Sequence, residues 1–160
     1  MNPEQNQIRV DIYEYLMKNN IMTLATAGND PWVCAVYYGM DEDLNLYILT
    51  GTDTKHAMHL KNNHKVAFSI FDSHIKITDP KYGIQGKGVC KLAHSMSEIT
   101  KGASLWHKFN PGSEKKYSIR SLIEAAAGSR IYKITPTYIK FFNKDKYGDE
   151  AYGIYEPTIK

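Results

Sequence analysis

Residues 21–50 decide the fold, and they read IMTLATAGND PWVCAVYYGM DEDLNLYILT. Three short runs of apolar and β-branched residues are separated by two clusters of turn-forming residues, 28–31 and 39–45. Connections this short join antiparallel neighbours. The stretch therefore predicts three consecutive antiparallel strands. Their expected bounds are 21–27, 32–38 and 46–50.

The flanking sequence continues this pattern and adds amphipathic helices. Further strands are expected at 65–71, 83–92, 130–134 and 138–142. Helices are expected near the N-terminus and at 54–61, 95–109 and 118–127. A turn at Thr135-Pro136 would join the last two strands, and glycines 83, 86 and 88 indicate a bulge or a close backbone approach. The sum is a mainly β (α+β) fold, a six- to seven-stranded antiparallel barrel with peripheral helices.

Length and composition are those of one globular domain spanning residues 1–160. Hydrophobic residues make up 42% of the chain and charged residues 23%, and no apolar run approaches the ~18 residues of a membrane span. The sequence begins without the basic and apolar pattern of a secretory signal, so we expect a cytoplasmic protein that does not enter a membrane. Two cysteines, Cys34 and Cys90, are too few for a disulfide framework, and we expect them to be reduced.

The charge pattern argues against nucleic-acid binding. Lysine and arginine (20) barely exceed aspartate and glutamate (17), the net charge is +3, and no stretch is strongly basic. Nucleic-acid-binding domains concentrate Lys and Arg in a stripe, often with exposed aromatic residues between them. A nucleic-acid-binding barrel is therefore the last of the functions considered, and we expect no nucleic-acid partner.

The segment 46–66 carries the residues best suited to bind a ligand. A strand is followed by a glycine-containing turn and then by a helix that starts with Thr54, Lys55 and His56. The start of a helix has unpaired N–H groups and partial positive charge, so hydroxyls and a cation at that place can hold a phosphate. Spacing alone favours a second interpretation, in which Asp53 or Thr54 caps the helix and Lys55 is a solvated side chain, because caps of this kind are found on most helices.

Other catalytic or metal-binding motifs do not emerge from the sequence. His56 and His59 are neighbours on the expected helix, but they lack a third metal ligand, so we predict no metal site. The chain contains no nucleophile elbow, Walker loop or dinucleotide fingerprint in the required context. The catalytic residues therefore stay unknown.

The order and spacing of several short motifs resemble the pyridoxamine 5′-phosphate oxidase-like FMN-binding split barrels, in particular short bacterial members of unassigned activity. Each motif alone is weakly specific, but the series covers roughly residues 8–142. The matching residues are Leu24-Ala25-Thr26, Pro31, Tyr47 with Thr50, Thr54-Lys55-His56, Asn62-Asn63 with Val66, Gly86-Lys87-Gly88, and the segment 131–139, which resembles the family's last β-hairpin.

The resemblance implies a Greek-key split barrel that forms a homodimer with FMN at the subunit interface. Thr54, Lys55 and His56 would hold the FMN phosphate, with Thr50 nearby. The ring and ribityl chain would lie against the backbone of four consecutive residues of the second strand, and a glutamine on the fifth strand would donate to the flavin. These residues are Cys34, Ala35, Val36, Tyr37 and Gln85.

Departures from the family pattern shape the functional expectation. Lys55 stands where the family has arginine, and lysine binds phosphate as a point charge rather than as a fork. The segment 152–158 lacks the Arg-x-His element with which the true oxidases hold pyridoxal phosphate. We therefore expect an FMN-dependent oxidoreductase that acts on another small molecule. The alternatives are a split barrel that binds haem or the deazaflavin F420, and a flavin-binding protein without turnover.

Overall fold

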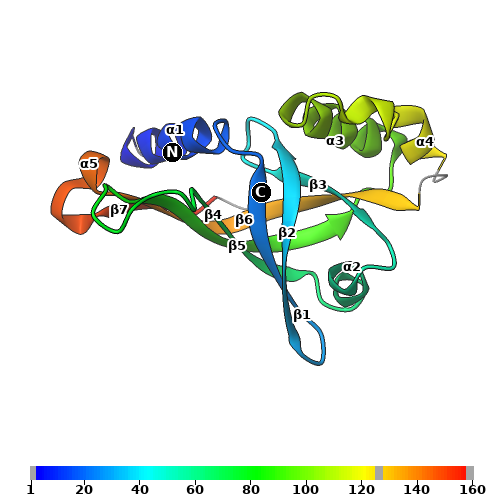
Figure 1. Ribbon diagram of the computed structural model, residues 1–160, viewed down its shortest axis with the longest axis horizontal. Helices are drawn as coiled ribbons and strands as arrows, with labels where there is room; N and C mark the ends of the chain where they lie inside the picture. Colours follow the sequence, from blue (N-terminus) through cyan, green and yellow to red (C-terminus); the bar gives the residue numbers. More distant parts are fainter. Residues whose placement is uncertain (1–2, 125–127, 158–160) are drawn as a thin grey trace.

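A closed six-stranded antiparallel barrel forms the body of the protein in the computed structural model, which describes residues 3–124 and 128–157 (Figure 1). The strands occur in the order β3-β2-β1-β4-β5-β6, and an additional pairing of β3 with β6 closes the ring. A short seventh strand, β7, extends the sheet beyond β6. The bounds are β1 (Ile21–Ala27), β2 (Pro31–Met40), β3 (Leu46–Gly51), β4 (Lys65–Phe71), β5 (Tyr82–Leu92), β6 (Ser129–Asn143) and β7 (Tyr152–Tyr155).

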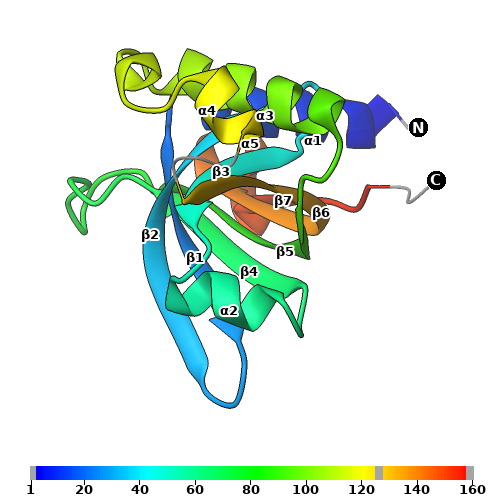
Figure 2. The same ribbon diagram turned by 90° about the vertical axis from the view of Figure 1, so that its right-hand side faces the viewer.

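The connectivity is a Greek key, because β1, β2 and β3 follow one another as neighbours and β4 returns beside β1. Three helices, α1, α3 and α4, lie on one side of the barrel, and α2 lies on the opposite side (Figures 1 and 2). The helices are α1 (Pro3–Leu16), α2 (Lys55–Leu60), α3 (Met96–Phe109), α4 (Ile119–Ile123) and α5 (Lys144–Tyr147), with short 3₁₀ turns at 113–115 and 148–150. The expected mainly β barrel with peripheral helices is confirmed.

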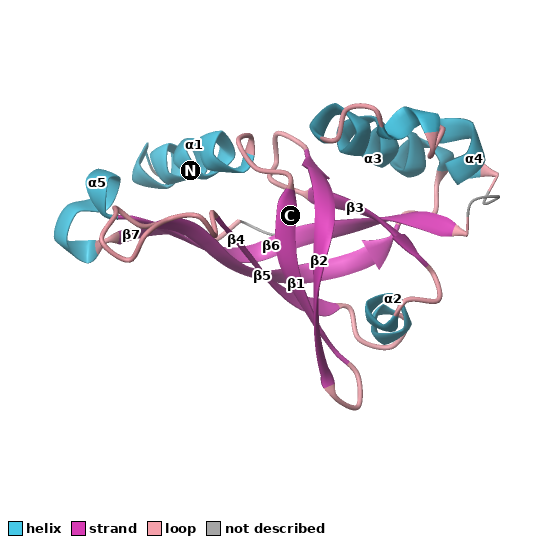
Figure 3. Cartoon of the chain, in the orientation of Figure 1, coloured by secondary structure: helices cyan, strands magenta, loops and turns pink. Residues whose placement is uncertain are grey.

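Two expectations for the C-terminal part are wrong. The segments 130–134 and 138–142 are parts of the single strand β6 and are not joined by a turn (Figure 3). The register shifts opposite Lys87 and Gly88, so Thr137 is an extra residue in β6 and Pro136 lies opposite Gly88. A bulge accommodates proline within a strand because it relieves the need for a paired N–H. The second error is β7, which the sequence analysis did not predict.

The helices begin where the sequence predicts. Thr54 caps α2 by accepting a hydrogen bond from the backbone N–H of Ala57. Ser95 and Glu98 form a capping box at the start of α3. The helix expected at 118–127 is observed as α4, and residues 125–127 lie outside the described part of the chain. None of the helices in the described ranges is long and apolar enough to cross a membrane.

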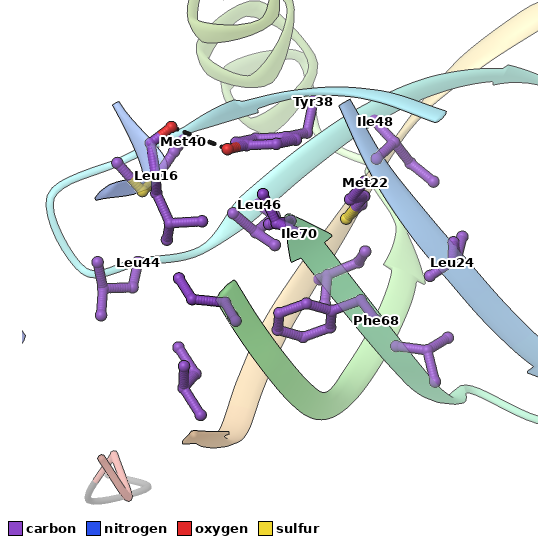
Figure 4. Packing of buried hydrophobic residues seen from close by; sticks show 14 of the residues in the cluster. Leu16, Met22, Leu24, Tyr38, Met40, Leu44, Leu46, Ile48, Phe68 and Ile70 are labelled. Carbon is purple, nitrogen blue, oxygen red and sulfur yellow. Dashed lines mark hydrogen bonds between the residues drawn. The ribbon is translucent and has the colours of Figure 1, made fainter. Parts of the chain in front are cut away.

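Large apolar side chains from every barrel strand fill the interior (Figure 4). Tyr38 is fully buried there, and its hydroxyl donates a 2.8 Å hydrogen bond to the carbonyl of Leu16 at the end of α1. Burying a Leu, Ile or Phe side chain contributes about 1.5–3 kcal/mol each. The labelled members of the cluster are Leu16, Met22, Leu24, Tyr38, Met40, Leu44, Leu46, Ile48, Phe68 and Ile70.

Helix α3 lies directly on the barrel, because glycines remove side chains from the contact. A Cβ atom on Gly39 of β2 would collide with the backbone carbonyl of Leu105. A Cβ atom on Gly102 of α3 would lie 2.6 Å from Ile131 Cγ2 and 2.8 Å from Tyr47 Cδ1. The separation of helix and sheet is thus set by these two positions.

Replacement of Gly39 by alanine tests this contact. Because the obstacle is backbone, α3 would have to move away, and we expect Gly39→Ala to lower the free energy of unfolding by about 1–3 kcal/mol. Urea denaturation followed by circular dichroism measures the change. Gly112→Ala serves as a control for overpacking, because a Cβ atom there meets nothing within 4 Å and reports only the cost of its positive φ.

The turn between β2 and β3 is built around a buried carboxylate. Asp41 accepts hydrogen bonds from the backbone N–H of Asn45 (2.9 Å) and the hydroxyl of Tyr47 (2.9 Å), and it pairs with Lys101 of α3 at 2.8 Å. Burial by itself would raise the pKa of Asp41, but the hydrogen bonds from Lys101, Asn45 and Tyr47 outweigh burial and lower the pKa. The ionised form is therefore bound more tightly in the folded chain than in the unfolded one.

The lowered pKa of Asp41 predicts a loss of stability in acid. The stabilisation is complete above the ordinary value of 3.8 and disappears as the pH falls through the lower native value. We expect Asp41→Asn to be less stable than the natural chain at neutral pH and to show a shallower decline of the unfolding free energy below pH 3.8. Asp43→Asn is the matched control, and equal acid slopes in both variants would contradict the role of Asp41.

Candidate functional site

The corner between β3 and α2 gathers the polar residues that the sequence singled out. Strand β3 ends at Gly51, two turn residues follow, and Thr54 opens α2. Because β3 pairs with β6 on its outer side, with Thr50 opposite Arg130 and Gly51 opposite Ser129, the end of the strand is fixed. The side chain of Thr54 donates to the carbonyl of Gly51 at 2.9 Å and accepts from Ala57 N–H, which fixes the start of the helix as well.

A buried histidine links three of the predicted site residues. His56 Nε2 lies 2.7 Å from Thr50 Oγ1 and 3.1 Å from Thr54 Oγ1, and His56 Nδ1 lies 3.3 Å from Cys34 Sγ. Strands β2 and β3 and helix α2 each contribute to this group. The structure therefore brings Cys34, Thr50, Thr54 and His56 together.

Burial keeps this group uncharged. Removal from water, and to a lesser extent the nearby His59, lower the pKa of His56 below its ordinary value. Burial raises the pKa of the Cys34 thiol. At neutral pH the pair is thus a neutral imidazole beside a protonated thiol, which is the opposite of an activated cysteine nucleophile.

One arrangement of hydrogens satisfies the contacts of His56, while the carbonyl of Leu24, 3.8 Å from Cys34 Sγ, is a second acceptor for the thiol. Neutral His56 has a single N–H. Its other ring nitrogen can therefore only accept a hydrogen bond, and the Cys34 thiol can donate it. With Cys34 S–H donating to Nδ1, Nε2–H donates to the hydroxyl oxygen of Thr50. The hydroxyl proton of Thr50 then points either toward Thr54 Oγ1, 3.5 Å away, or toward a bound ligand.

Lys55 lies at the outer side of the corner and contacts the tip of the β1–β2 hairpin. Its Nζ atom is 2.7 Å from Asp30 Oδ2 and 4.7 Å from the centre of the Trp32 ring. The cap of the second interpretation is thus observed at Thr54, and Lys55 is a partly exposed side chain that forms an ion pair. Sequence reasoning treated Asp30 only as a turn residue, because no local pattern links residues so far apart in the chain.

The two histidines of α2 face different partners. His59 Nδ1 lies 3.1 Å from Thr26 Oγ1, and His59 Nε2 lies 3.8 Å from Asp30 Oδ1, whereas His56 faces Cys34 and the threonines. Among the described residues no group of three or more His, Cys, Asp or Glu side chains is placed to hold a metal ion.

The predicted residues of β2 alternate between the interior and the outside. Cys34 is half-buried and Val36 is buried in the core, so Val36 can offer only its backbone to a ligand. Ala35 and Tyr37 point outward, and 53% of Tyr37 is exposed. Ala35 therefore presents only a small, exposed side chain on β2 beside the corner. A planar ligand can lie flat against the strand at such a position.

Gln85 is not brought to the corner within one chain. The register places Ala35 opposite Thr23, Thr23 opposite Ser69, and Ser69 opposite Gln85, so three strand spacings separate Gln85 from Ala35. At ~4.8 Å per spacing the separation is about 14 Å along the sheet. Gln85 instead lines a cleft of about 460 Å³ with Phe71, Lys140 and Phe142.

The outer surface of the barrel exposes several large apolar side chains. Exposed side chains of β1, β2, β4, β6 and β7 project from the same side of the sheet, since directly paired residues share a face. We call this set the outer sheet face; it comprises Ile21, Val33, Tyr37, Phe71, Phe142 and Tyr152.

Comparison with known proteins gives a consistent result. The family model described as pyridoxamine 5′-phosphate oxidase matches residues 11–143. A curated relative, UPF0306 protein PM1958 of Pasteurella multocida, is 44% identical over 62 residues, a match that covers 38% of this chain and 42% of that protein.

Solved structures share the fold at low sequence identity. The conserved hypothetical protein Rv2991 of Mycobacterium tuberculosis superposes with a TM-score of 0.71 at 17% identity, covering 94% of this chain and 89% of that one. A heme binding protein from Mycobacterium smegmatis gives a TM-score of 0.69 at 14% identity, covering 96% of this chain and 57% of that one. The match of the family model over most of the chain is decisive: this protein belongs to the pyridoxamine 5′-phosphate oxidase family, as its sequence motifs predicted.

Proposed function

We propose that the chain binds FMN at the β3–α2 corner and acts as a flavin-dependent oxidoreductase on a small molecule. The observation that carries the proposal is the convergence of Thr50, Thr54 and Lys55 at one corner of a barrel of this family. The Thr50 hydroxyl and the Lys55 ammonium group are donors suited to a phosphate monoester, and the Thr54 hydroxyl joins them by releasing the Gly51 carbonyl. Thr54, Lys55 and Thr50 hold the phosphate, and His56 acts behind them through its hydrogen bond to Thr50.

Bound FMN would supply the redox chemistry, and the chain would bind and orient it. The small side chain of Ala35 leaves room for a planar ring on the outer surface of β2. The ring would lie along the backbone of residues 34–37. Cys34 and His56 are neutral, so neither is expected to form a covalent bond with the substrate. The substrate differs from pyridoxamine phosphate, because the C-terminal segment that carries Arg-x-His in the true oxidases is here the strand β7, Tyr-Gly-Ile-Tyr.

A homodimer completes this proposal. The outer sheet face exposes six large apolar side chains that can pack against a second copy of the chain, and exposed patches of this kind mark interaction sites. Within one chain Gln85 is too far from β2 to reach a flavin bound there. We therefore place the flavin between protomers, with Gln85 of the partner subunit donating to its ring.

Haem is the alternative that one fold neighbour suggests, but the histidines favour flavin. Both ring nitrogens of His56 and of His59 already contact protein groups. His64, His74 and His94 are exposed, and His107 is buried against Ser113. Among the described residues, the histidines at the corner therefore keep no ring nitrogen for an axial haem bond, and the one buried side-chain nitrogen without a hydrogen-bond partner, His107 Nε2, lies on α3 on the opposite side of the barrel.

The absorption spectrum of the purified protein tests the cofactor directly. We expect bands in the near-ultraviolet and blue, and release of FMN on denaturation, identified by mass spectrometry. A Soret band would contradict the proposal in favour of haem. Oxidation of NADH or NADPH by the loaded protein then distinguishes an oxidoreductase from a flavin-binding protein without turnover.

Lys55→Ala tests the phosphate contact. Loss of a charged donor should weaken FMN binding about tenfold to a hundredfold, while riboflavin, which lacks the phosphate, should bind as before. Quenching of flavin fluorescence gives both dissociation constants. Lys61→Ala, at the other end of α2, is the matched control, and unchanged FMN affinity in Lys55→Ala would reject the role of Lys55.

Tyr37→Glu tests the dimer. A charge on the β2 part of the outer sheet face should convert a dimer into a monomer and weaken FMN binding with it, because the site is then incomplete. Light scattering after size-exclusion chromatography reports the mass. Met96→Glu places the same charge on another exposed apolar residue, on α3, and should leave the dimer intact. A natural chain that is monomeric with FMN bound would contradict the proposal.

A further inference from the structure

The tip of the β1–β2 hairpin is held against α2. A Cβ atom on Gly28 would lie 2.7 Å from the His59 ring, so the turn packs on the helix at the distance that only glycine permits. The side-chain amide of Asn63 donates to the carbonyl of Ala27 at 3.1 Å, just beyond the end of the helix. The hairpin tip therefore has a defined position beside Lys55.

From this position the hairpin supplies both partners of the Lys55 ammonium group. Asp30 is the anion, and the Trp32 ring provides an aromatic face for the same cation. The hydrogen bond from Lys55 lowers the pKa of Asp30, so the carboxylate is ionised at neutral pH. His59 Nε2 lies 3.8 Å from the other carboxylate oxygen of Asp30, so Lys55, at 2.7 Å, is the nearer cationic partner of this carboxylate.

We propose that Asp30 occupies Lys55 in place of the ligand, and that a phosphate monoester binds by displacing this carboxylate. The inference rests on the proposed function of the corner and assigns to Asp30 the role of an affinity- and specificity-determining residue. An ammonium group that holds two anions side by side gains less than twice the energy of one, because the anions repel each other. Binding of the phosphate is therefore strongest when Lys55 releases Asp30.

The exchange selects for ligand charge. A dianionic phosphate monoester attracts Lys55 more strongly than the single charge of Asp30 does, whereas a neutral flavin cannot displace the carboxylate. Asp30 is thus expected to lower the affinity for phosphate-bearing flavin and to leave the affinity for riboflavin unaffected. Exposed ion pairs contribute little to stability, and 58% of the Asp30 side chain is exposed, so removal of its charge should not unfold the chain.

Asp30→Asn tests the inference, because asparagine keeps the shape and the turn preference of aspartate. We expect the variant to bind FMN about two- to fivefold more tightly, the range that exposed ion pairs reach, with no change for riboflavin. Asp53→Asn removes the same charge from an exposed residue of the neighbouring turn, and it should have a clearly smaller effect. In a Lys55→Ala background the gain from Asp30→Asn should vanish.

The outcomes separate the inference from the proposed function. If the natural protein does not bind FMN more tightly than riboflavin, the phosphate site itself is wrong, and the role of Asp30 falls with it. If the natural protein prefers FMN but Asp30→Asn binds FMN equally or more weakly, only the exchange at Lys55 is overturned. An equal gain in Asp30→Asn and Asp53→Asn would also overturn it, as a general charge effect. Asp30→Ser provides a second variant if Asp30→Asn does not fold.

Discussion

The pairing of β3 with β6 is the constraint on which the rest of the molecule depends. Six consecutive residue pairs, from Leu46 with Ile134 to Gly51 with Ser129, close the barrel, while on its other side only the first half of β3 pairs with β2. Because the pairing with β6 continues through Thr50 and Gly51, the position of Thr50 and of the start of α2 is fixed. The polar corner is thus a consequence of barrel closure, and the buried His56 then joins β2 to it.

Much of the fold could be predicted from local pattern. The first five strands and the caps at Thr54 and Ser95 depend on residues within a few positions of one another, and all were found. The continuous strand β6 was not, because Pro136 reads as a break until Gly88 is known to lie opposite it. Strand β7 was missed for a similar reason: its four residues form a strand only because the edge of β6 is available.

The candidate site was predictable in its residue types and less so in its contacts. The motif Thr54-Lys55-His56 located the corner, and family membership is now shown by the family model. The hydrogen bonds and the ion pair of the corner join residues that are distant in sequence: Cys34 is 22 positions from His56, and Asp30 is 25 positions from Lys55. Burial also divides the three motif residues, since His56 faces inward while Lys55 faces the hairpin. Spacing along a helix does not reveal such a division.

The contact of α3 with β2 has an optical consequence. Trp106 donates its indole N–H to the carbonyl of Tyr37 at 3.1 Å, and Trp32, near the other end of the same strand, lies under Lys55. These are the two tryptophans of the chain. Trp32 therefore reports on the hairpin tip, and Trp106 of α3 reports on the contact between α3 and β2. The fluorescence emission of variants that keep one of the two tryptophans distinguishes changes at these two places without an attached label.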